Sequence, residues 1–325
     1  MRNSTEVLVS IICLTYNHEK YIQEALDGFV NQRTSFDYEI IVHDDASTDG
    51  TQKIVKEFEK KYPKLFNNIY QTENQHSKRK PVFRSLLQKA KGKYIAICEG
   101  DDYWIDVEKL EKQVSILEAN PDCAACCCNE LVIDGDGKPF KSQSLYYEAH
   151  DVKHDVSYLY DNCKFSHTAG LLIKKSIYPH DDDEKSNAYF KFRANGDMKW
   201  AALIAANGKM YHIAETMAVY RCILKGGDSW SARNFGKNIN LDTYNQLENI
   251  RNYFKEYYGF EISYQGYYNR LTKSAIIFCL KKPSHENRDI AKKLFWVTPH
   301  KLRFWLWLNG CLIRSVYNKM RTGKQ

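Results

Sequence analysis

The sequence contains no long hydrophobic segment. Its 325 residues are 43% hydrophobic, yet no stretch reaches the roughly 18 apolar residues that a membrane-spanning helix needs. The opening residues Met1–Glu6 are polar, and the apolar run Val7–Leu14 is too short for a secretory signal. These absences predict a cytoplasmic protein whose thiols are reduced.

Several ligand-binding motifs are also absent. Neither G-x-G-x-x-G nor G-K-[ST] occurs, which argues against a dinucleotide-binding fold and a P-loop. Cys123 and Cys126 have C-x₂-C spacing, but no second such pair follows, so we expect a buried strand rather than a zinc site. The net charge of +7 fits anionic substrates or lipid. Without a basic helix or zinc-finger spacing, we expect no nucleic-acid partner.

The first hundred residues alternate between apolar strands and amphipathic helices. Such alternation predicts an α/β fold with a mostly parallel sheet and helices on both faces. The expected strands are Val7–Thr15, Tyr38–His43, Asn68–Gln71 and Tyr94–Cys98. The expected helices cover about residues 19–32, 51–61 and 82–90.

Polar side chains follow three of these strands. They are Tyr16-Asn17, Asp44-Asp45 and Asp101-Asp102. Because ligands bind beyond the carboxyl ends of parallel strands, these clusters predict a single site. The acidic turn Glu99–Asp102 has two interpretations that the turn alone leaves open. Its carboxylates bind a divalent cation such as Mg²⁺ or Mn²⁺, or the turn leads into the next helix with Asp106 as its N-cap.

The later part of the chain divides at about residue 230. Up to there we expect further strands and helices, including a helix of about residues 198–207 that opens at Gly196-Asp197. Beyond Ser231, aromatic and basic residues interleave at helical spacing. The last expected helix, about residues 299–320, lies in a membrane interface or packs on the preceding domain. We therefore divide the chain into a domain of residues 1–230 and a helical region of residues 231–325.

Three segments carry a family resemblance: VSIICLTYNHEKYIQEAL, EIIVHDDASTDGT and GKYIAICEGDDYW. In this order they resemble the signature blocks of the family 2 inverting glycosyltransferases of the GT-A fold, over about residues 7–230. The resemblance implies a nucleotide-sugar donor, most often a UDP-sugar, and a Mn²⁺ or Mg²⁺ cofactor. It also implies a glycan or lipid-linked acceptor in bacterial surface polysaccharide synthesis, at the inner face of the cell membrane.

The resemblance implies roles for residues on the nucleotide side of the site. Tyr16 matches the position that contacts the base and ribose. Asp45, with Asp44 beside it, matches the carboxylate that holds the uracil or ribose. Lys78 and Arg79 fall where basic residues of the family often meet the nucleotide.

Further roles are implied on the sugar side. Asp102 matches the metal ligand, and Asp101 would face the ribose or the metal. Asp197, in the sequence NGDMKW, matches the catalytic base that takes a proton from the acceptor hydroxyl. Many relatives carry a histidine two residues after a Tyr-Arg pair, whereas this chain has Ile223 there. Where that histidine helps the metal or the pyrophosphate, Arg221, Lys225 and the amides of the following loop are the candidates to replace it.

Two functions of other classes remain open. A nucleotidyltransferase also uses strand-end carboxylates and Mg²⁺, but it usually has a glycine-rich loop after its first strand. The corresponding segment here, LTYNHEKY, has no glycine. The second alternative is a non-catalytic protein that binds a nucleotide-sugar or a lipid carrier, although Asp102 and Asp197 are both present.

Overall fold

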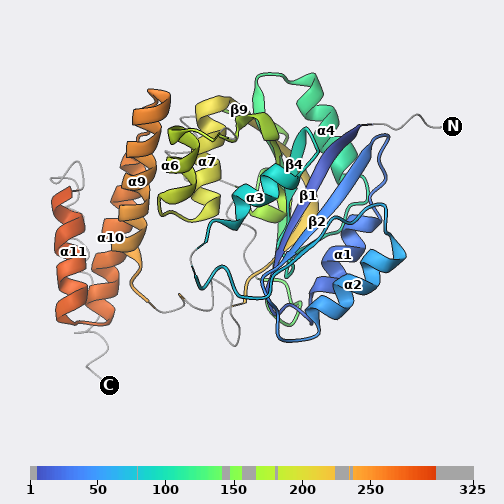
Figure 1. Cartoon of the computed structure of the whole chain (residues 1–325). Coiled ribbons are helices and arrows are strands. Elements are labelled where there is room, and N and C mark those ends of the chain that lie inside the picture. Colours follow the sequence, from blue (N-terminus) through green and yellow to red (C-terminus); the bar gives the residue numbers. More distant parts are fainter. Residues whose placement is uncertain are drawn as a thin grey trace.

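A mixed β-sheet runs through the computed structural model, with helices on both faces (Figure 1). The structure describes residues 6–78, 80–140, 147–155, 166–179, 182–223, 234 and 237–297. Within these residues the sheet has nine strands, in the order β3-β2-β1-β4-β8-β6-β9-β5, with β7 paired to β9.

The N-terminal part forms the parallel half of the sheet. β1 pairs in parallel with β2 and β4, and β2 pairs in parallel with β3. The prediction of strands buried on both faces is confirmed, since Ile11, Ile12 and Cys13 are all inaccessible to solvent. The elements are β1 (Val7–Thr15), α1 (Ile22–Val30), β2 (Asp37–Asp44), α2 (Thr51–Lys61), β3 (Ile69–Tyr70), α3 (Val82–Lys89) and β4 (Tyr94–Ile97).

The middle of the chain extends the sheet on the other side of β4. β8 runs antiparallel to both β4 and β6, and β6 pairs in parallel with β9. The elements are β5 (Tyr103–Trp104), α4 (Lys109–Ala119), β6 (Cys123–Ile133), β7 (Val152–His154), η1 (Thr168–Gly170), β8 (Leu172–Lys174), η2 (Lys175–Ile177), α6 (Glu184–Lys191), α7 (Gly196–Asn207) and β9 (Lys209–Arg221).

The strand β6 and the start of helix α4 were both predicted from the sequence. The cysteines of β6 are buried and unpaired, as expected for a strand that uses cysteine as a small apolar residue. The expectation that Asp106 caps the next helix is wrong, because Glu108 holds the N-cap position of α4. Asp106 instead accepts hydrogen bonds from the Glu108 N–H and from Lys112 Nζ.

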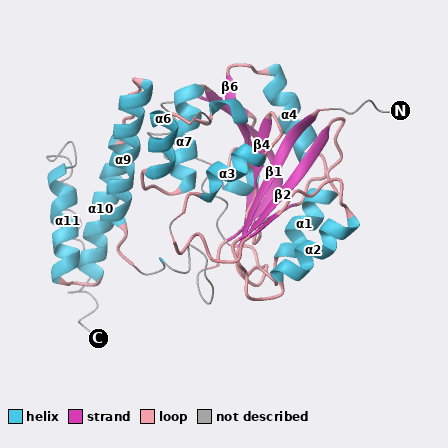
Figure 2. Ribbon diagram, viewed as in Figure 1, coloured by secondary structure: helices cyan, strands magenta, loops and turns pink. Residues whose placement is uncertain are grey.

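Two hydrophobic clusters cover the two faces of the sheet. One packs α1, α2 and α4 on one face. The other packs α3 and α7 on the opposite face and continues into α9 (Asn240–Tyr258) and α10 (Gln265–Lys281). α11 (His285–Val297) packs on α10 at the edge of the molecule (Figure 2). None of the described helices is long and apolar enough to cross a membrane. The helix expected over residues 299–320 lies outside the described residues.

Candidate active site

The loops that follow β1, β2 and β4 meet at one edge of the sheet. Parallel pairing sets Thr15 opposite Asp44 and Ile12 opposite Ile97. The loops are then joined directly: the Asp45 N–H donates to the Thr15 carbonyl, and the Gly100 N–H donates to the Leu14 carbonyl. The polar clusters that the sequence places after the three strands are therefore neighbours in the fold.

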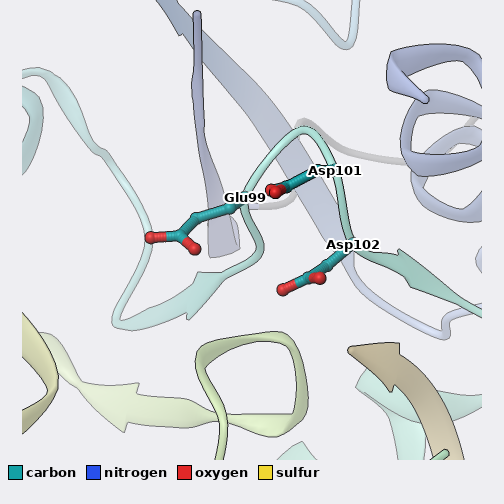
Figure 3. Close-up of side chains that lie close together, drawn as sticks. All are labelled: Glu99, Asp101 and Asp102. Carbon is teal, nitrogen blue, oxygen red and sulfur yellow. The ribbon is translucent and has the colours of Figure 1, made fainter. Parts of the chain in front are cut away.

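The acidic turn after β4 gathers three carboxylates (Figure 3). Glu99, Asp101 and Asp102 each offer one oxygen, and these oxygens lie within 4.8 Å of one another. Asp101 and Asp102 are buried, and Glu99 is half-buried. Glu99 was part of the predicted turn but not of the predicted ligand set. The sequence feature that could have identified Glu99 as a third ligand is its position two residues before Asp101. At this spacing the carboxylates of a tight turn can share one ligand.

The pKa values in this turn report carboxyls whose burial and mutual repulsion outweigh any nearby positive charge. Burial, followed by repulsion from Asp101 and Asp197, raises the pKa of Glu99 to about 8. Burial, together with repulsion from Asp101 and Glu99, raises the pKa of Asp102 well above its usual value of 3.8. Both shifts have the causes expected for acids held together in a poorly solvated place. A cation at this position would reverse them.

The donor set fits a divalent cation. Asp102 Oδ1 accepts the Arg221 N–H at 2.7 Å, whereas its Oδ2 is buried without a hydrogen-bond partner. An orphaned carboxylate oxygen is costly unless a ligand satisfies it. Hard oxygen donors of this kind are the ligands that Mg²⁺ and Mn²⁺ prefer. The residues present are therefore suited to either ion, and this is the one such group among the described residues.

The loop after β1 packs tightly against the back of this turn. A Cβ atom on Gly100 would lie 2.7 Å from Thr15 Oγ1 and 2.9 Å from His18 Nδ1, so a larger residue would force these side chains to move. His18 Nδ1 also lies 3.9 Å from Asp101 Oδ1. Thr15 and His18 were not predicted as site residues. Their positions depend on how β1 and β4 pair, which no local pattern specifies.

The predicted nucleotide-side carboxylates already hold backbone in this structure. Asp45 accepts the N–H groups of Gln75 at 2.7 Å and of His76 at 3.0 Å, one on each oxygen. Asp44 accepts the Ser47 N–H and Gln52 Nε2 on Oδ2, while its Oδ1 is buried without a partner. Asp45 thereby fastens the loop of residues 72–78 over the end of the sheet.

Tyr16 is half-buried at the end of β1, next to a strained connection. Asn17 has φ 55° and Ala46 has φ 62°, both in the left-handed region that costs non-glycine residues energy. The Asn17 N–H donates to Ser47 Oγ, and Asn17 Oδ1 accepts the Thr48 N–H. This reciprocal pair fixes the loops that carry Tyr16 and Asp45 relative to each other.

Of the two predicted basic residues, Lys78 and Arg79, the structure describes only Lys78. Lys78 is exposed and forms an ion pair with Glu73 in the same loop. Arg79 lies outside the described residues. The loop that contains Lys78 is the one that Asp45 holds, so Lys78 belongs to the same edge of the sheet as the carboxylates.

Asp197 approaches the acidic turn from the second half of the chain. It occupies the first turn of α7 and accepts the Met198 N–H at 2.8 Å. Its side chain is open to solvent, yet the surrounding protein desolvates its carboxyl and raises its pKa above the usual 3.8. The charge of Asp197 is close enough to Glu99 to raise the pKa of that residue. The structure thus brings the predicted base and the predicted metal turn to the same side of the sheet.

Comparison with known proteins identifies the family. The family model described as Glycosyl transferase family 2 matches residues 10–180, more than half of the chain. The chain belongs to this family, as its three signature segments predicted.

The chain is also similar to individual proteins. An uncharacterised protein of Mycobacterium tuberculosis is 37% identical over 217 residues, which are 66% of this chain and 58% of that protein. The putative teichuronic acid biosynthesis glycosyltransferase TuaG of Bacillus subtilis is 33% identical over 147 residues, which are 43% of this chain and 56% of that protein. In both cases the match spans less than two thirds of the relative's length.

The fold is also found in a solved structure. The chain is similar to residues 1–349 of S. aureus TarS, crystallised in complex with UDP-GlcNAc, with a TM-score of 0.61 and 16% identity. The similarity covers 89% of this chain and 80% of that chain. The predicted α/β architecture of the GT-A type, with helices after it, is confirmed.

Proposed function

We propose that this protein is a metal-dependent inverting glycosyltransferase that moves a sugar from a UDP-sugar to an acceptor hydroxyl. The observation that carries the proposal is the cluster of Glu99, Asp101 and Asp102, whose oxygens lie within 4.8 Å of one another. An unsatisfied Asp102 oxygen and the nearby charge of Asp197 support it. The UDP-GlcNAc bound by the structurally similar TarS supports a uridine nucleotide as the leaving group.

The nucleotide would bind between the loops after β1 and β2. Tyr16 supplies a ring beside Asp45, and Asp45 retains hydrogen-bonding capacity because each carboxylate oxygen accepts about two bonds. Each of its oxygens accepts one backbone N–H of the loop that carries Lys78. Lys78 and Arg79 add positive charge to that loop, which favours an anionic diphosphate.

The chemical step is a single displacement. The Asp197 carboxylate accepts the proton of the acceptor hydroxyl while the hydroxyl oxygen bonds to the sugar C1. The bond between C1 and the diphosphate oxygen breaks with its electron pair, UDP leaves, and the configuration at C1 inverts. Asp102, and Asp101 beside it, would hold the Mn²⁺ or Mg²⁺ ion. A bound divalent cation supplies Lewis-acid neutralisation of the leaving diphosphate.

The acceptor we propose is a growing glycan on a lipid carrier, in the synthesis of a bacterial surface polysaccharide. This acceptor is supported by the relative TuaG, which is named as a putative glycosyltransferase of teichuronic acid biosynthesis. Membrane contact at the inner face would come from the amphipathic segment of residues 299–320. The last described helix leads into that segment with an exposed Trp296, 61% accessible, and tryptophan is a residue that favours the membrane interface.

The test is a calorimetric titration of UDP into the purified protein, with and without Mn²⁺. Wild-type protein should bind UDP more tightly with Mn²⁺ by about tenfold or more, since metal and diphosphate bind together at such sites. Asp102→Asn keeps an acceptor for the Arg221 N–H but loses the charge, so it should lose the Mn²⁺-dependent part. Asp289→Asn, a surface change on α11, is the matched control.

The result also defines the donor. If UDP binds, a panel of UDP-sugars identifies the sugar that is transferred. If UDP binds neither with nor without Mn²⁺, the assignment of a UDP-sugar is wrong, and GDP- and dTDP-sugars are tested in the same way. If UDP binds equally well in both conditions, the metal dependence is wrong.

A further inference from the structure

Arg221 is a buried arginine at the acidic turn whose side chain faces the protein. It is the last residue of β9 and is only 5% exposed. From the sequence, Arg221 is one of several candidates to replace a missing histidine at the metal or the diphosphate. Its contacts in the structure indicate another role.

Hydrogen bonds to the acidic turn and to helix α1 tie Arg221 to its surroundings. Its backbone N–H donates to Asp102 Oδ1 at 2.7 Å. Its Nε donates to the Asp101 carbonyl oxygen at 3.0 Å, and its guanidinium NH2 group donates to Glu24 Oε2 at 2.7 Å. The same residue therefore holds the backbone of the turn, one carboxylate oxygen of the turn, and helix α1.

Aromatic rings fix the direction of the guanidinium group. Its central carbon lies 4.5 Å from the centre of the Tyr21 ring and 5.6 Å from that of Tyr103. Tyr21 is itself anchored, because its hydroxyl donates to the Gly135 carbonyl. Guanidinium groups that stack on rings and pair with a carboxylate lose much of their freedom to turn toward another ligand.

The backbone N–H of Arg221, rather than its guanidinium, orients the Asp102 carboxylate. Since Oδ1 is held by the Arg221 N–H, Oδ2 is the oxygen left without a partner. A ligand whose neighbours fix its rotamer binds a metal more tightly than a free one, and loss of such neighbours typically costs about 10–100-fold in metal affinity.

We propose that Arg221 is a positioning residue that sets the acidic turn for its cation, and that Glu24 in turn holds Arg221. The inference rests on the proposed function, because it assumes that the turn binds a metal. The guanidinium acts by holding the backbone carbonyl of Asp101, and so the course of the turn that carries Asp102, while the backbone N–H holds the Asp102 carboxylate. In this role Arg221 makes no contact with the diphosphate. Direct contact with the diphosphate is the competing role, and the two make different predictions for binding without metal.

The test measures Mn²⁺ binding alone, from the electron paramagnetic resonance signal of free Mn²⁺, in the full-length protein. Arg221→Met keeps the backbone N–H and much of the side-chain volume but removes the guanidinium. It should weaken Mn²⁺ binding by about 10–100-fold, while UDP affinity in EDTA stays within about twofold of wild type. Arg251→Met, in the surface pair with Glu248, is the matched control and should bind Mn²⁺ as wild type does.

A second pair of variants keeps the test valid if Arg221→Met fails to fold. The Glu24 side chain is 49% exposed, so Glu24→Ala should fold. It removes the anchor of the guanidinium and should also weaken Mn²⁺ binding. Glu24→Gln keeps an oxygen for the guanidinium and should recover most of the affinity, a rescue that general destabilisation would not give.

Two results would overturn the proposal. Unchanged Mn²⁺ affinity in both Arg221→Met and Glu24→Ala means that the pair does not position the turn. Loss of UDP affinity in EDTA for Arg221→Met, with Glu24→Ala unaffected, means that Arg221 contacts the diphosphate directly. A failure of the proposed function is distinguishable from both, because the wild-type protein itself would then bind no Mn²⁺.

Discussion

At the scale of single residues, the site brings several carboxyls together without enough positive charge to offset their burial. Three carboxylates lie in one turn, and Asp197 adds to the repulsion on Glu99. Among these residues, Asp102 has a cationic neighbour in Arg221, whose charge lowers the pKa of Asp102 but does not offset its burial. Such an arrangement costs stability in the free protein. It is the state expected of the cation site that we propose.

Asp197 allows a prediction about turnover and pH. Because its pKa is raised above 3.8 by desolvation, the carboxylate that accepts a proton forms only as the pH rises through this higher value. Turnover should therefore increase with pH along an acidic limb displaced above the range of an ordinary aspartate. Asp197→Asn should lower turnover by about 10²–10⁴-fold and leave UDP affinity unchanged.

The measurement is the initial rate of UDP release over a range of pH, with calorimetry for UDP binding. Asp289→Asn again serves as the control of equal charge change. Turnover near the wild-type level in Asp197→Asn would show that another group is the base.

At the scale of elements, helix α9 supports the loop that leads into α7, the helix that carries Asp197. Gln246 Oε1 accepts the N–H of Asn195, the N-cap residue of α7, at 2.7 Å. Asn249 Nδ2 donates to the Arg193 carbonyl in the same loop. Gln246 is oriented by a further bond from its Nε2 to Asp242. A helix from beyond residue 230 thus fixes the entry into α7.

We expect Gln246→Leu to lower kcat without changing UDP affinity. Loss of the acceptor for the Asn195 N–H lets the start of α7 shift, and a displacement of about 1 Å at a reacting group costs up to about 100-fold in rate. Steady-state kinetics and calorimetry together measure the two effects. Equal losses of kcat and of UDP affinity would mean that α9 supports the fold in general.

A reversed hydrogen-bond pair provides the control for this prediction. The double variant Gln246→Glu with Asp242→Asn keeps an oxygen for the Asn195 N–H and keeps a bond between the two side chains with its direction inverted. It should restore kcat relative to Gln246→Leu, because the side chain at position 246 again offers an oxygen that accepts the Asn195 N–H.

At the scale of the whole molecule, the C-terminal helices share a core with the sheet. One hydrophobic cluster contains Ile12 of β1, Ile95 of β4, Trp200 of α7 and Phe254 of α9. The sequence suggested a division near residue 230, and the boundary itself falls outside the described residues. Because they bury side chains in one cluster, the sheet and α9 should unfold together, even though the sequence pattern changes near residue 230.

Phe254→Ala tests this shared core. Phe254 is fully buried, and truncation of a buried phenylalanine costs about 3–5 kcal/mol of the free energy of unfolding. Urea unfolding followed by circular dichroism and by fluorescence should show one transition, shifted to lower urea. Leu280→Ala, at a position 48% exposed, should change the free energy by less than about 0.5 kcal/mol. A separate early transition, shifted alone, would show that the helices fold as their own unit.

The sequence by itself determined the alternating elements and the polar strand ends. Hydrophobic periodicity is a local property, so α2 was predicted with the bounds Thr51–Lys61 that the structure has. Parallel pairing then follows from the alternation of strands and helices, which is why the clusters after β1, β2 and β4 were expected to meet.

Only the tertiary structure decided which distant groups complete the site. Arg221 contacts Asp102 across 119 residues of sequence, and Gln246 holds the Asn195 N–H across 51 residues. Such contacts depend on strand register and helix packing. Both are set by the burial of a common core, which outweighs the weak conformational preferences of individual residues. No spacing pattern marks Arg221 as facing inward or α9 as a support for Asp197. Residue types and strand ends can be read locally, whereas the direction in which each side chain faces is settled by packing.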